Sequence, residues 1–202
     1  MKRQQIKEIA LRLFAAGGYE GTALSEIAKE ANMKTPSLYA HFSSKEHLYL
    51  SVFADVIHEH VRYIEDLMEQ IIDEPLERKL FRIVSGACRY YLTSEVKIAF
   101  IKRTILFPPA SLKERIRARF LASEQSLSRV LRELFTEGIE SGAIRKEELE
   151  SLLASYYCLL DGSFIQLFYY GQADFEKRLE TVWKMYWIGI TNKEGDNRWK
   201  PS

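Results

Sequence analysis

A run of hydrogen-bonding side chains without any acidic residue lies between Asn32 and Ser44. Within it, Leu38 and Phe42 are spaced i, i+4, so both would face inward on a short helix. The residues left on the outer face are polar or cationic: Lys34, Thr35, Ser37, Tyr39 and His41. A solvated amphipathic helix would ordinarily carry Glu or Asp there, and a surface that faces phosphates requires their absence. The pattern therefore favours contact with a nucleic acid.

Two helices, the second of them short, would precede this run. The first is expected over residues 2–16 and ends at Gly17-Gly18, because glycine readily adopts the left-handed conformation of a helix C-terminus. The second carries Leu24, Ile27, Ala28 and Ala31 on its inner face. Thr22 is the N-cap that we expect for it.

A tight turn and a third helix complete the pattern. Asn32 tolerates positive φ and would turn the chain. The third helix is expected to begin near Thr35, with Pro36 at its first position, and to end near Phe42. Two short helices around such a turn have the size of a helix-turn-helix, whose second helix enters the major groove of DNA.

The remaining chain predicts longer helices and no strands. Ser43-Ser44 would cap a helix that begins at Lys45, and breaks are expected at Pro108-Pro109, Gly142 and Gly171. The expected helices cover residues 45–74, 76–93, 97–107, 111–140, 146–170 and 174–191. We therefore predict an all-α protein of about nine helices, with a helix-turn-helix domain at 1–48, a larger helical domain at 49–191 and a polar tail at 192–202.

Composition excludes several classes of protein. Of the 202 residues, 47% are hydrophobic and 28% are charged, as in an ordinary globular protein. No apolar run is long enough to span a bilayer, and no signal peptide is recognisable, so a cytoplasmic location without a membrane partner is expected. Cys88 and Cys158 lie in apolar stretches and are expected to be reduced and buried. The net charge is only +1, and residues 1–50 hold seven Lys/Arg against five Asp/Glu.

The N-terminal segment resembles the TetR/AcrR (tetracycline-repressor) family of regulators from about Ile6 to Phe53. The matching residues are Phe14, Gly18-Tyr19, Thr22, Ile27-Ala28, Ala31, Ser37-Leu38-Tyr39-Ala40-His41-Phe42 and Lys45-Glu46-His47-Leu48. The turn departs from the family pattern, because Asn32-Met33-Lys34 replaces the usual Gly-Val-Ser and Pro36 replaces Gly or Ala. The departure alters the reading surface, so no operator sequence can be inferred.

The resemblance implies a role in DNA binding for each matching position. Base edges or adjacent backbone would be met by Lys34, Thr35, Pro36 and Ser37, and phosphates by Thr22, Tyr39, His41 and Lys45. Alternatively, Tyr39 packs half-buried against its own domain and His41 is an exposed, unengaged imidazole.

The resemblance also implies a homodimer and a small-molecule effector. Leu159-Leu160-Asp161-Gly162 is similar to a weaker motif in the dimerising helix of the family. The last two helices are apolar on more than one face, which supports burial on two sides, although both could simply form the core of a monomer. The expected interface residues are Leu153, Tyr156, Leu160, Gly162, Ser163, Leu167, Leu179, Val182, Trp183 and Tyr186. The pocket candidates are Phe81, Cys88, Tyr91, Phe100, Phe107, Phe120, Tyr157 and Phe164. They suggest a largely apolar effector, although aromatic residues at helical spacing more often belong to the core.

Two further features of the sequence have a simpler interpretation. The basic stretch Lys97–Arg119 could contact DNA or an acidic effector, but pairing with acids such as Glu59 is favoured. His58-Glu59-His60 lacks metal-ligand spacing, so neither a metal nor a cofactor is expected.

We therefore expect that the protein is not an enzyme. We expect an effector-responsive repressor that binds double-stranded DNA at a palindromic operator. The alternatives are an activator or dual regulator, or a helical ligand-binding protein or enzyme that has lost DNA binding.

Overall fold

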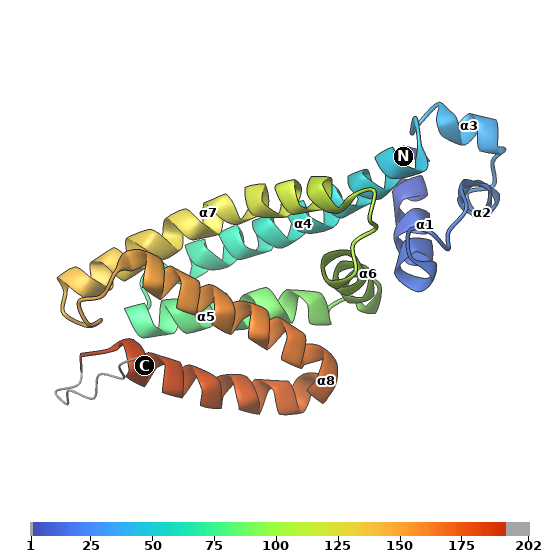
Figure 1. The fold of residues 1–202 in the computed structure, drawn as a ribbon. Coiled ribbons are helices and arrows are strands. Elements are labelled where there is room, and N and C mark those ends of the chain that lie inside the picture. The colour runs from blue at the N-terminus through green and yellow to red at the C-terminus, as the bar shows by residue number, and fades with distance from the viewer. Residues whose placement is uncertain (1, 193–202) are drawn as a thin grey trace. The chain divides into compact units, whose positions relative to one another are not determined.

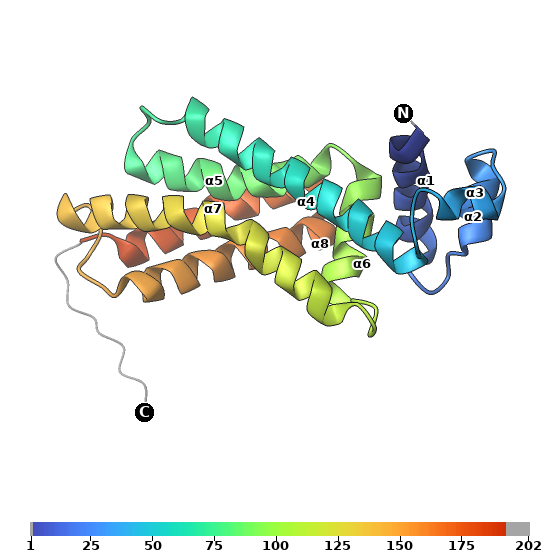
Figure 2. The same cartoon turned by 90° about the horizontal axis from the view of Figure 1, so that it is seen from above.

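The computed structural model describes residues 2–192, except the side chain of Ala173, and all its regular elements are helices (Figures 1 and 2). The predicted all-α fold is confirmed. The expected tail at 192–202 lies outside the described residues beyond Asn192. The helices are α1 (Lys2–Gly17), α2 (Leu24–Glu30), α3 (Thr35–Tyr39), α4 (Lys45–Gln70), α5 (Leu76–Leu92), α6 (Glu95–Leu106), α7 (Lys113–Glu140) and α8 (Leu149–Ile190).

The longest helix, α8, is interrupted where the sequence predicted a break. Gly171 has φ 69° and ψ 172°, a conformation that side chains other than glycine rarely adopt. The two segments on either side of it run antiparallel (Figure 1). Within residues 2–192, the chain therefore has nine helical segments, as expected. Positive φ at Gly18 and Gly142 likewise confirms the expected helix ends.

The described chain forms two compact units that combine distant segments. Among the described residues, the first contains 2–66 and 89–126, and the second contains 67–88 and 127–192. The predicted domains at 1–48 and 49–191 are instead continuous along the chain, and those boundaries stay a prediction. No described helix combines the length and apolar character needed to cross a bilayer.

In the first unit, α6 and the start of α7 pack against α1 and α4. Figures 1 and 2 show α4 and the first part of α7 side by side. Arg119 on α7 donates to the Leu50 carbonyl of α4 at 3.0 Å. Lys97 on α6 pairs with Glu59 of α4, which confirms the favoured partner for that part of the basic stretch. Several cations of the stretch therefore hold helices of this unit together.

The contact between α6 and α1 centres on a glycine and an arginine. Arg103 donates to the carbonyl of Ala16 at 3.2 Å and so satisfies an acceptor at the end of α1. Its side chain lies over Gly18, where an added Cβ would be 2.9 Å from Arg103 Nη1. Gly18 therefore has two structural roles: its positive φ ends α1, and its lack of a side chain leaves space for Arg103.

The second unit has its core between α5, α7 and both segments of α8. Tyr156 is fully buried, and its hydroxyl donates to the Leu80 carbonyl at 2.7 Å. The Tyr156 ring contacts Phe135 edge-on with centroids 5.8 Å apart. Phe81 on α5 packs against Trp183 at 5.5 Å. A polar tyrosine can occupy such a core because its hydroxyl has an acceptor.

The two cysteines differ from expectation in one respect. Cys88 is buried as predicted, but Cys158 is exposed, so the expectation that both are buried is wrong. Apolar neighbours in sequence did not bury Cys158, because its position on α8 lies on the outer face of the helix. Burial and the nearby Asp161 carboxylate raise the pKa of the Cys88 thiol to about 12.

Candidate nucleic-acid interface

The turn between α2 and α3 has the geometry that its sequence predicted. Asn32 has φ 51°, the one positive φ outside glycine among the described residues. The N–H of Asn32 donates to the Lys29 carbonyl at 3.1 Å, and that of Met33 donates to the Ala28 carbonyl at 2.9 Å. These bonds end α2 and redirect the chain into α3. Asn therefore makes the turn without the glycine that is usual in the family pattern.

Helix α3 presents its polar side chains outward. Leu38 and Phe42 are fully buried, as their spacing predicted, and they anchor α3 against its own unit. Tyr39 is 52% exposed, which is against the alternative of a packed tyrosine. Lys34, Pro36 and Ser37 are exposed, and Thr35 and His41 are half-buried. One correction concerns the start of α3, since Lys34 is the N-cap and Pro36 occupies the second helical position.

Thr22 does not have the expected role at the start of α2. The N-cap is Ala23, whose N–H is bound by the Glu26 carboxylate at 2.9 Å. Thr22 is only 2% exposed, and its hydroxyl lies 2.8 Å from the Gly18 carbonyl and 3.1 Å from that of Leu13. The hydroxyl thus closes the loop after α1 and is not available for a phosphate. Sequence inspection missed the cap because Glu26 acts from within the helix.

Lys45 lies at the N-terminus of α4, where a capping serine is found as predicted. Ser44 accepts a hydrogen bond from the His47 N–H at 3.0 Å. Lys45 Nζ lies 4.5 Å from the centroid of the Tyr19 ring and donates to the Glu20 carbonyl at 3.4 Å. Burial and the Glu20 charge raise the pKa of Tyr19, so its hydroxyl stays protonated at neutral pH. The Lys45 ammonium is thus held between a neutral ring and a carbonyl at the edge of the helix-turn-helix.

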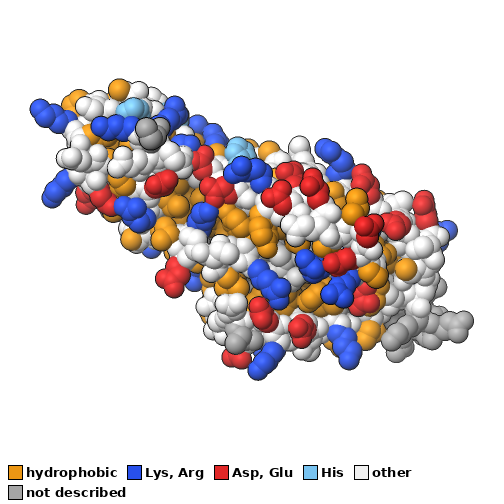
Figure 3. Space-filling model, turned by 180° about the vertical axis from the view of Figure 1, so that it is seen from behind, with side chains coloured by type: hydrophobic (Ala, Val, Ile, Leu, Met, Phe, Trp, Pro, Cys, Tyr) orange, Lys and Arg blue, Asp and Glu red, His pale blue; other side chains and the backbone are white. Residues whose placement is uncertain are grey.

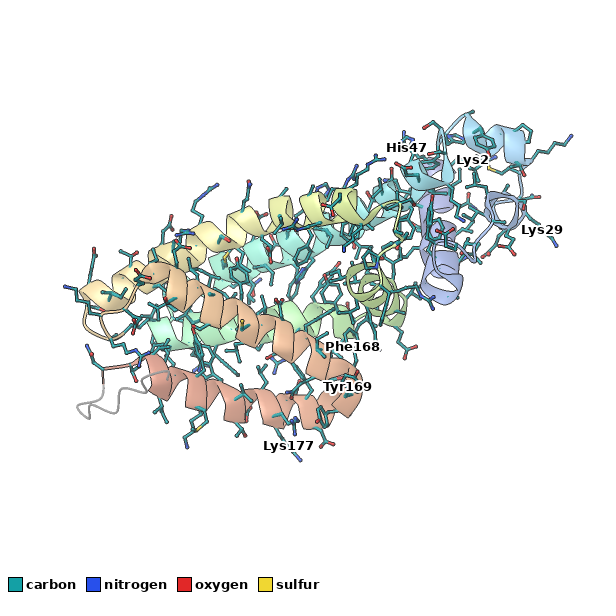
Figure 4. All side chains as sticks on the ribbon, in the orientation of Figure 1. Lys2, Lys29, His47, Phe168, Tyr169 and Lys177 are labelled. Carbon is teal, nitrogen blue, oxygen red and sulfur yellow. The ribbon has the colours of Figure 1, made fainter. Side chains whose placement is uncertain are left out.

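The charge around this motif is modest and localised. In Figure 3 the helix-turn-helix, at upper left, carries Lys and Arg side chains around a His, with acidic side chains along its lower edge. Figure 4 labels Lys2 on α1, Lys29 on α2 and His47 on α4, that is, on the motif and on the helices that flank it. The described surface therefore combines placed cations with hydrogen-bonding side chains, which suits phosphate contacts beside a base-reading helix.

The dimer candidates lie on both faces of α8. Leu153, Tyr156, Ser163, Leu167, Leu179 and Trp183 are buried within the second unit, and Leu160 and Tyr186 are half-buried. Gly162 and Val182 are exposed. The buried members fill the core of their own protomer, so a partner could be met only by the outer face. That face also carries residues that the prediction left out, namely Ala154, Cys158, Met185 and Ile188.

The pocket candidates divide between the two units. Tyr91, Phe100, Phe107 and Phe120 belong to the first, and Phe81, Cys88, Tyr157 and Phe164 belong to the second. Phe107 is 74% exposed, so it is not interior to its unit. Phe100 is fully buried against the Tyr49 ring, with centroids 5.3 Å apart. Tyr157 has a polar partner, because its hydroxyl lies 2.7 Å from that of Ser128.

Metal chemistry finds no support in the described residues. Over residues 2–192, no three His, Cys, Asp or Glu side chains are grouped so that they could hold a metal ion.

Together, the helix-turn-helix at the N-terminus and the helical domain that follows define a DNA-binding regulatory protein.

Comparison with known proteins specifies the family. The family model described as bacterial regulatory proteins, tetR family, matches residues 6–52. This match assigns residues 6–52 to the tetR family of bacterial regulatory proteins. Two relatives that match most of the chain are also named as regulators. The biofilm operon icaADBC negative transcriptional regulator IcaR of Staphylococcus aureus is 28% identical over 173 residues, 82% of this chain and 87% of the relative. The fatty acid metabolism regulator protein of Bacillus subtilis is 26% identical over 153 residues, 76% and 75% of the two chains.

Solved structures show the same fold. The transcriptional regulator FadR from Bacillus subtilis, in complex with stearoyl-CoA, has a TM-score of 0.73 at 22% identity and covers 93% of this chain and 98% of its own. AibR, in complex with isovaleryl coenzyme A and operator DNA, has a TM-score of 0.65 at 22% identity, with 92% and 97% covered.

Proposed function

We propose that this regulator is a repressor that binds a palindromic operator as a homodimer and is released by a small, largely apolar ligand. The observation that carries the proposal is the outer face of α3, where exposed Lys34, Ser37 and Tyr39 stand free of acidic residues on a helix anchored by Leu38. Repression is favoured over activation because the relative IcaR is named a negative regulator.

A homodimer would supply the second recognition helix that an inverted repeat requires. Two copies of α3 must reach successive major grooves, about 34–36 Å apart, to read two half-sites. The outer face of α8 supports pairing, since Ala154, Cys158 and Gly162 form an exposed line of small residues at i, i+4 and i+8. In the following segment, Val182 and Met185 are exposed apolar side chains, at 41% and 67%. Small and apolar residues allow close approach of helices from two copies.

Acyl-coenzyme A esters are the ligand class that we propose to test first. Two proteins of the same fold are described in complex with stearoyl-CoA and with isovaleryl coenzyme A. In this chain, Phe81, Cys88, Tyr157 and Phe164 of the second unit are the apolar candidates to meet an acyl chain. A ligand changes DNA affinity only through its differential binding to the two states, and about 1.4 kcal/mol of difference suffices for tenfold.

Selection from random DNA duplexes tests the operator proposal. The purified chain should enrich an inverted repeat, and the retained duplex should bind two chains as measured by sedimentation. An activator would enrich the same DNA, so transcription in vitro from a promoter that overlaps the selected site separates the two, with repression expected. Failure to enrich any duplex at low salt would contradict the proposal and favour a helical ligand-binding protein that has lost DNA binding.

Titration with ligands tests the effector class on the selected duplex. Stearoyl-CoA or isovaleryl-CoA should weaken binding at least tenfold, while free coenzyme A should have little effect, because it lacks the acyl chain. If neither ester releases the protein from the duplex at concentrations that saturate its binding of a fluorescent acyl-CoA probe, acyl-CoA is not the effector.

A further inference from the structure

Two cations begin α1 at a place where helix electrostatics disfavours them. Lys2 and Arg3 are exposed, and the first turn of α1 contains no acidic residue. The aligned peptide dipoles give a helix N-terminus a partial positive charge, so acidic side chains stabilise it and cations do not. The helices α2, α4, α5, α6, α7 and α8 each carry a Glu in the first turn. The start of α1 is thus suited to an external anion.

The Arg3 side chain is held beside the end of the recognition helix. Its guanidinium lies over the Phe42 ring, 4.8 Å from the centroid. Phe42 follows α3 by three residues and is fully buried, and its ring also meets His47 at 5.5 Å. Stacking on a fixed aromatic ring orients the planar guanidinium and leaves its in-plane N–H groups for other acceptors.

Arg3 differs from Lys7 and Arg12, the cations farther along α1, in having no acidic partner. Lys7 pairs with Asp55 at 2.8 Å, and Arg12 pairs with Glu30. Within residues 2–192, the Arg3 guanidinium meets no hydrogen-bond acceptor and no carboxylate. An exposed, oriented guanidinium of this kind is the group that binds a phosphate through two parallel N–H bonds.

We propose that Arg3 binds a phosphate of the DNA strand beside the C-terminal end of α3, so that the DNA-binding surface extends onto α1. This inference rests on the proposed binding of operator DNA. Each half-site gains one phosphate contact, or two for a dimer, and the contact adds affinity without reading sequence. Lys2, next to it in the chain and also exposed, adds charge without the same orientation.

The salt dependence of binding tests this contact. The affinity of the selected duplex is measured over a series of salt concentrations for the wild type, Arg3→Gln and Arg3→Lys. Arg129→Gln on α7 is the control, because it removes the same charge from an exposed position in the other unit. We expect Arg3→Gln to weaken binding about tenfold and to reduce the slope of log K against log salt by about 1.8, or 0.9 per phosphate. Arg3→Lys should keep most of the slope, and the control should keep all of it.

A purely structural role for Arg3 makes a different prediction. If Arg3 only packs on Phe42, Arg3→Gln lowers the melting temperature and leaves the salt slope unchanged, which would overturn the inference. Should Arg3→Gln fail to fold, phosphate-ethylation interference compares the wild type with Arg3→Met, which removes the charge but keeps an unbranched side chain that can pack on Phe42. One phosphate per half-site must then lose sensitivity in the variant, and an identical pattern overturns the inference. A wild type that binds no duplex contradicts the proposed function itself, so the two failures are distinguishable.

Discussion

The hydroxyl oxygen of Tyr49 lies 2.7 Å from Oγ1 of Thr104, and both side chains are buried. Thr104 donates its own proton to the Phe100 carbonyl at 2.7 Å, so Tyr49 is the donor in the pair. The bond joins α4, which follows the helix-turn-helix, to α6 within the first unit. Desolvation raises the pKa of Tyr49, which keeps the donor protonated.

Removal of this hydroxyl should weaken the first unit without disturbing its packing. Tyr49→Phe keeps the ring contacts with Phe14 and Phe100, and Thr104 keeps its acceptor. We expect the free energy of unfolding to fall by about 1 kcal/mol, the usual net value of one hydrogen bond. Urea denaturation measures it, with Tyr39→Phe as the exposed control. An equal loss of unfolding free energy in both variants would show that the buried hydrogen bond stabilises the fold no more than an exposed hydroxyl does.

Residues of the DNA-binding surface should divide into two kinds. Tyr39→Ala and Lys45→Ala are expected to weaken binding to all duplexes, because phosphate contacts carry no sequence information. Thr35→Ala and Ser37→Ala should instead change the preferred bases, by about 1–3 kcal/mol per base contact. Selection repeated with each variant measures both effects. If Tyr39→Ala and Lys45→Ala bind the palindrome with unchanged affinity, the proposed docking of α3 is wrong.

A bulky side chain at Gly162 should separate the proposed dimer. Gly162 is exposed and a Cβ added there would meet nothing within 4 Å, so we expect the single protomer to accommodate Gly162→Trp. We expect this variant to sediment as a monomer with an unchanged circular dichroism spectrum. Glu137→Trp, at an exposed position of α7, is the matched control. A Gly162→Trp protein that remains dimeric would place the interface elsewhere.

The two thiols should react at very different rates. Cys88 is buried with its pKa raised to about 12, so almost none of its reactive thiolate is present at pH 8. Cys158 is exposed in the single chain. Alkylation with iodoacetamide, followed by mass spectrometry, should label Cys158 alone in the folded protein. Dimerisation through α8 should slow this labelling, and Gly162→Trp should restore it. Rapid labelling of Cys88 in the folded state would contradict its burial.

Ionisation of Cys88 also gives a pH dependence with a definite sign. The folded-state pKa is above that of the unfolded chain, so the unfolded state loses the proton first as pH rises. Stability is therefore present in full below about pH 9 and is lost between there and pH 12. Cys88→Ala should show a smaller loss over this window in denaturant unfolding. The same loss in both proteins would assign the effect to other groups.

Much of the fold could be predicted because local rules govern it. Glycine and asparagine at Gly18, Asn32 and Gly171 adopt the positive φ that their types permit, and the helices end there. Spacing placed Leu38 and Phe42 inside α3. The cap of α2 was wrong, because the choice between Thr22 and Ala23 depends on where carbonyls of the preceding loop lie, and those are positioned by packing.

The amino-acid sequence by itself determined the all-α fold, the turn at Asn32 and the polar outer face of α3, since each follows from neighbours within a few residues. Only the tertiary structure decided which side chains are free to act. In it, the Thr22 hydroxyl is bonded to a loop carbonyl and Tyr156 is buried in the core of its own protomer. Cys158 is exposed, and the Arg3 guanidinium lies over the Phe42 ring. Burial and partnership depend on residues far apart in the chain, and a helical pattern records which face is apolar but not what covers it.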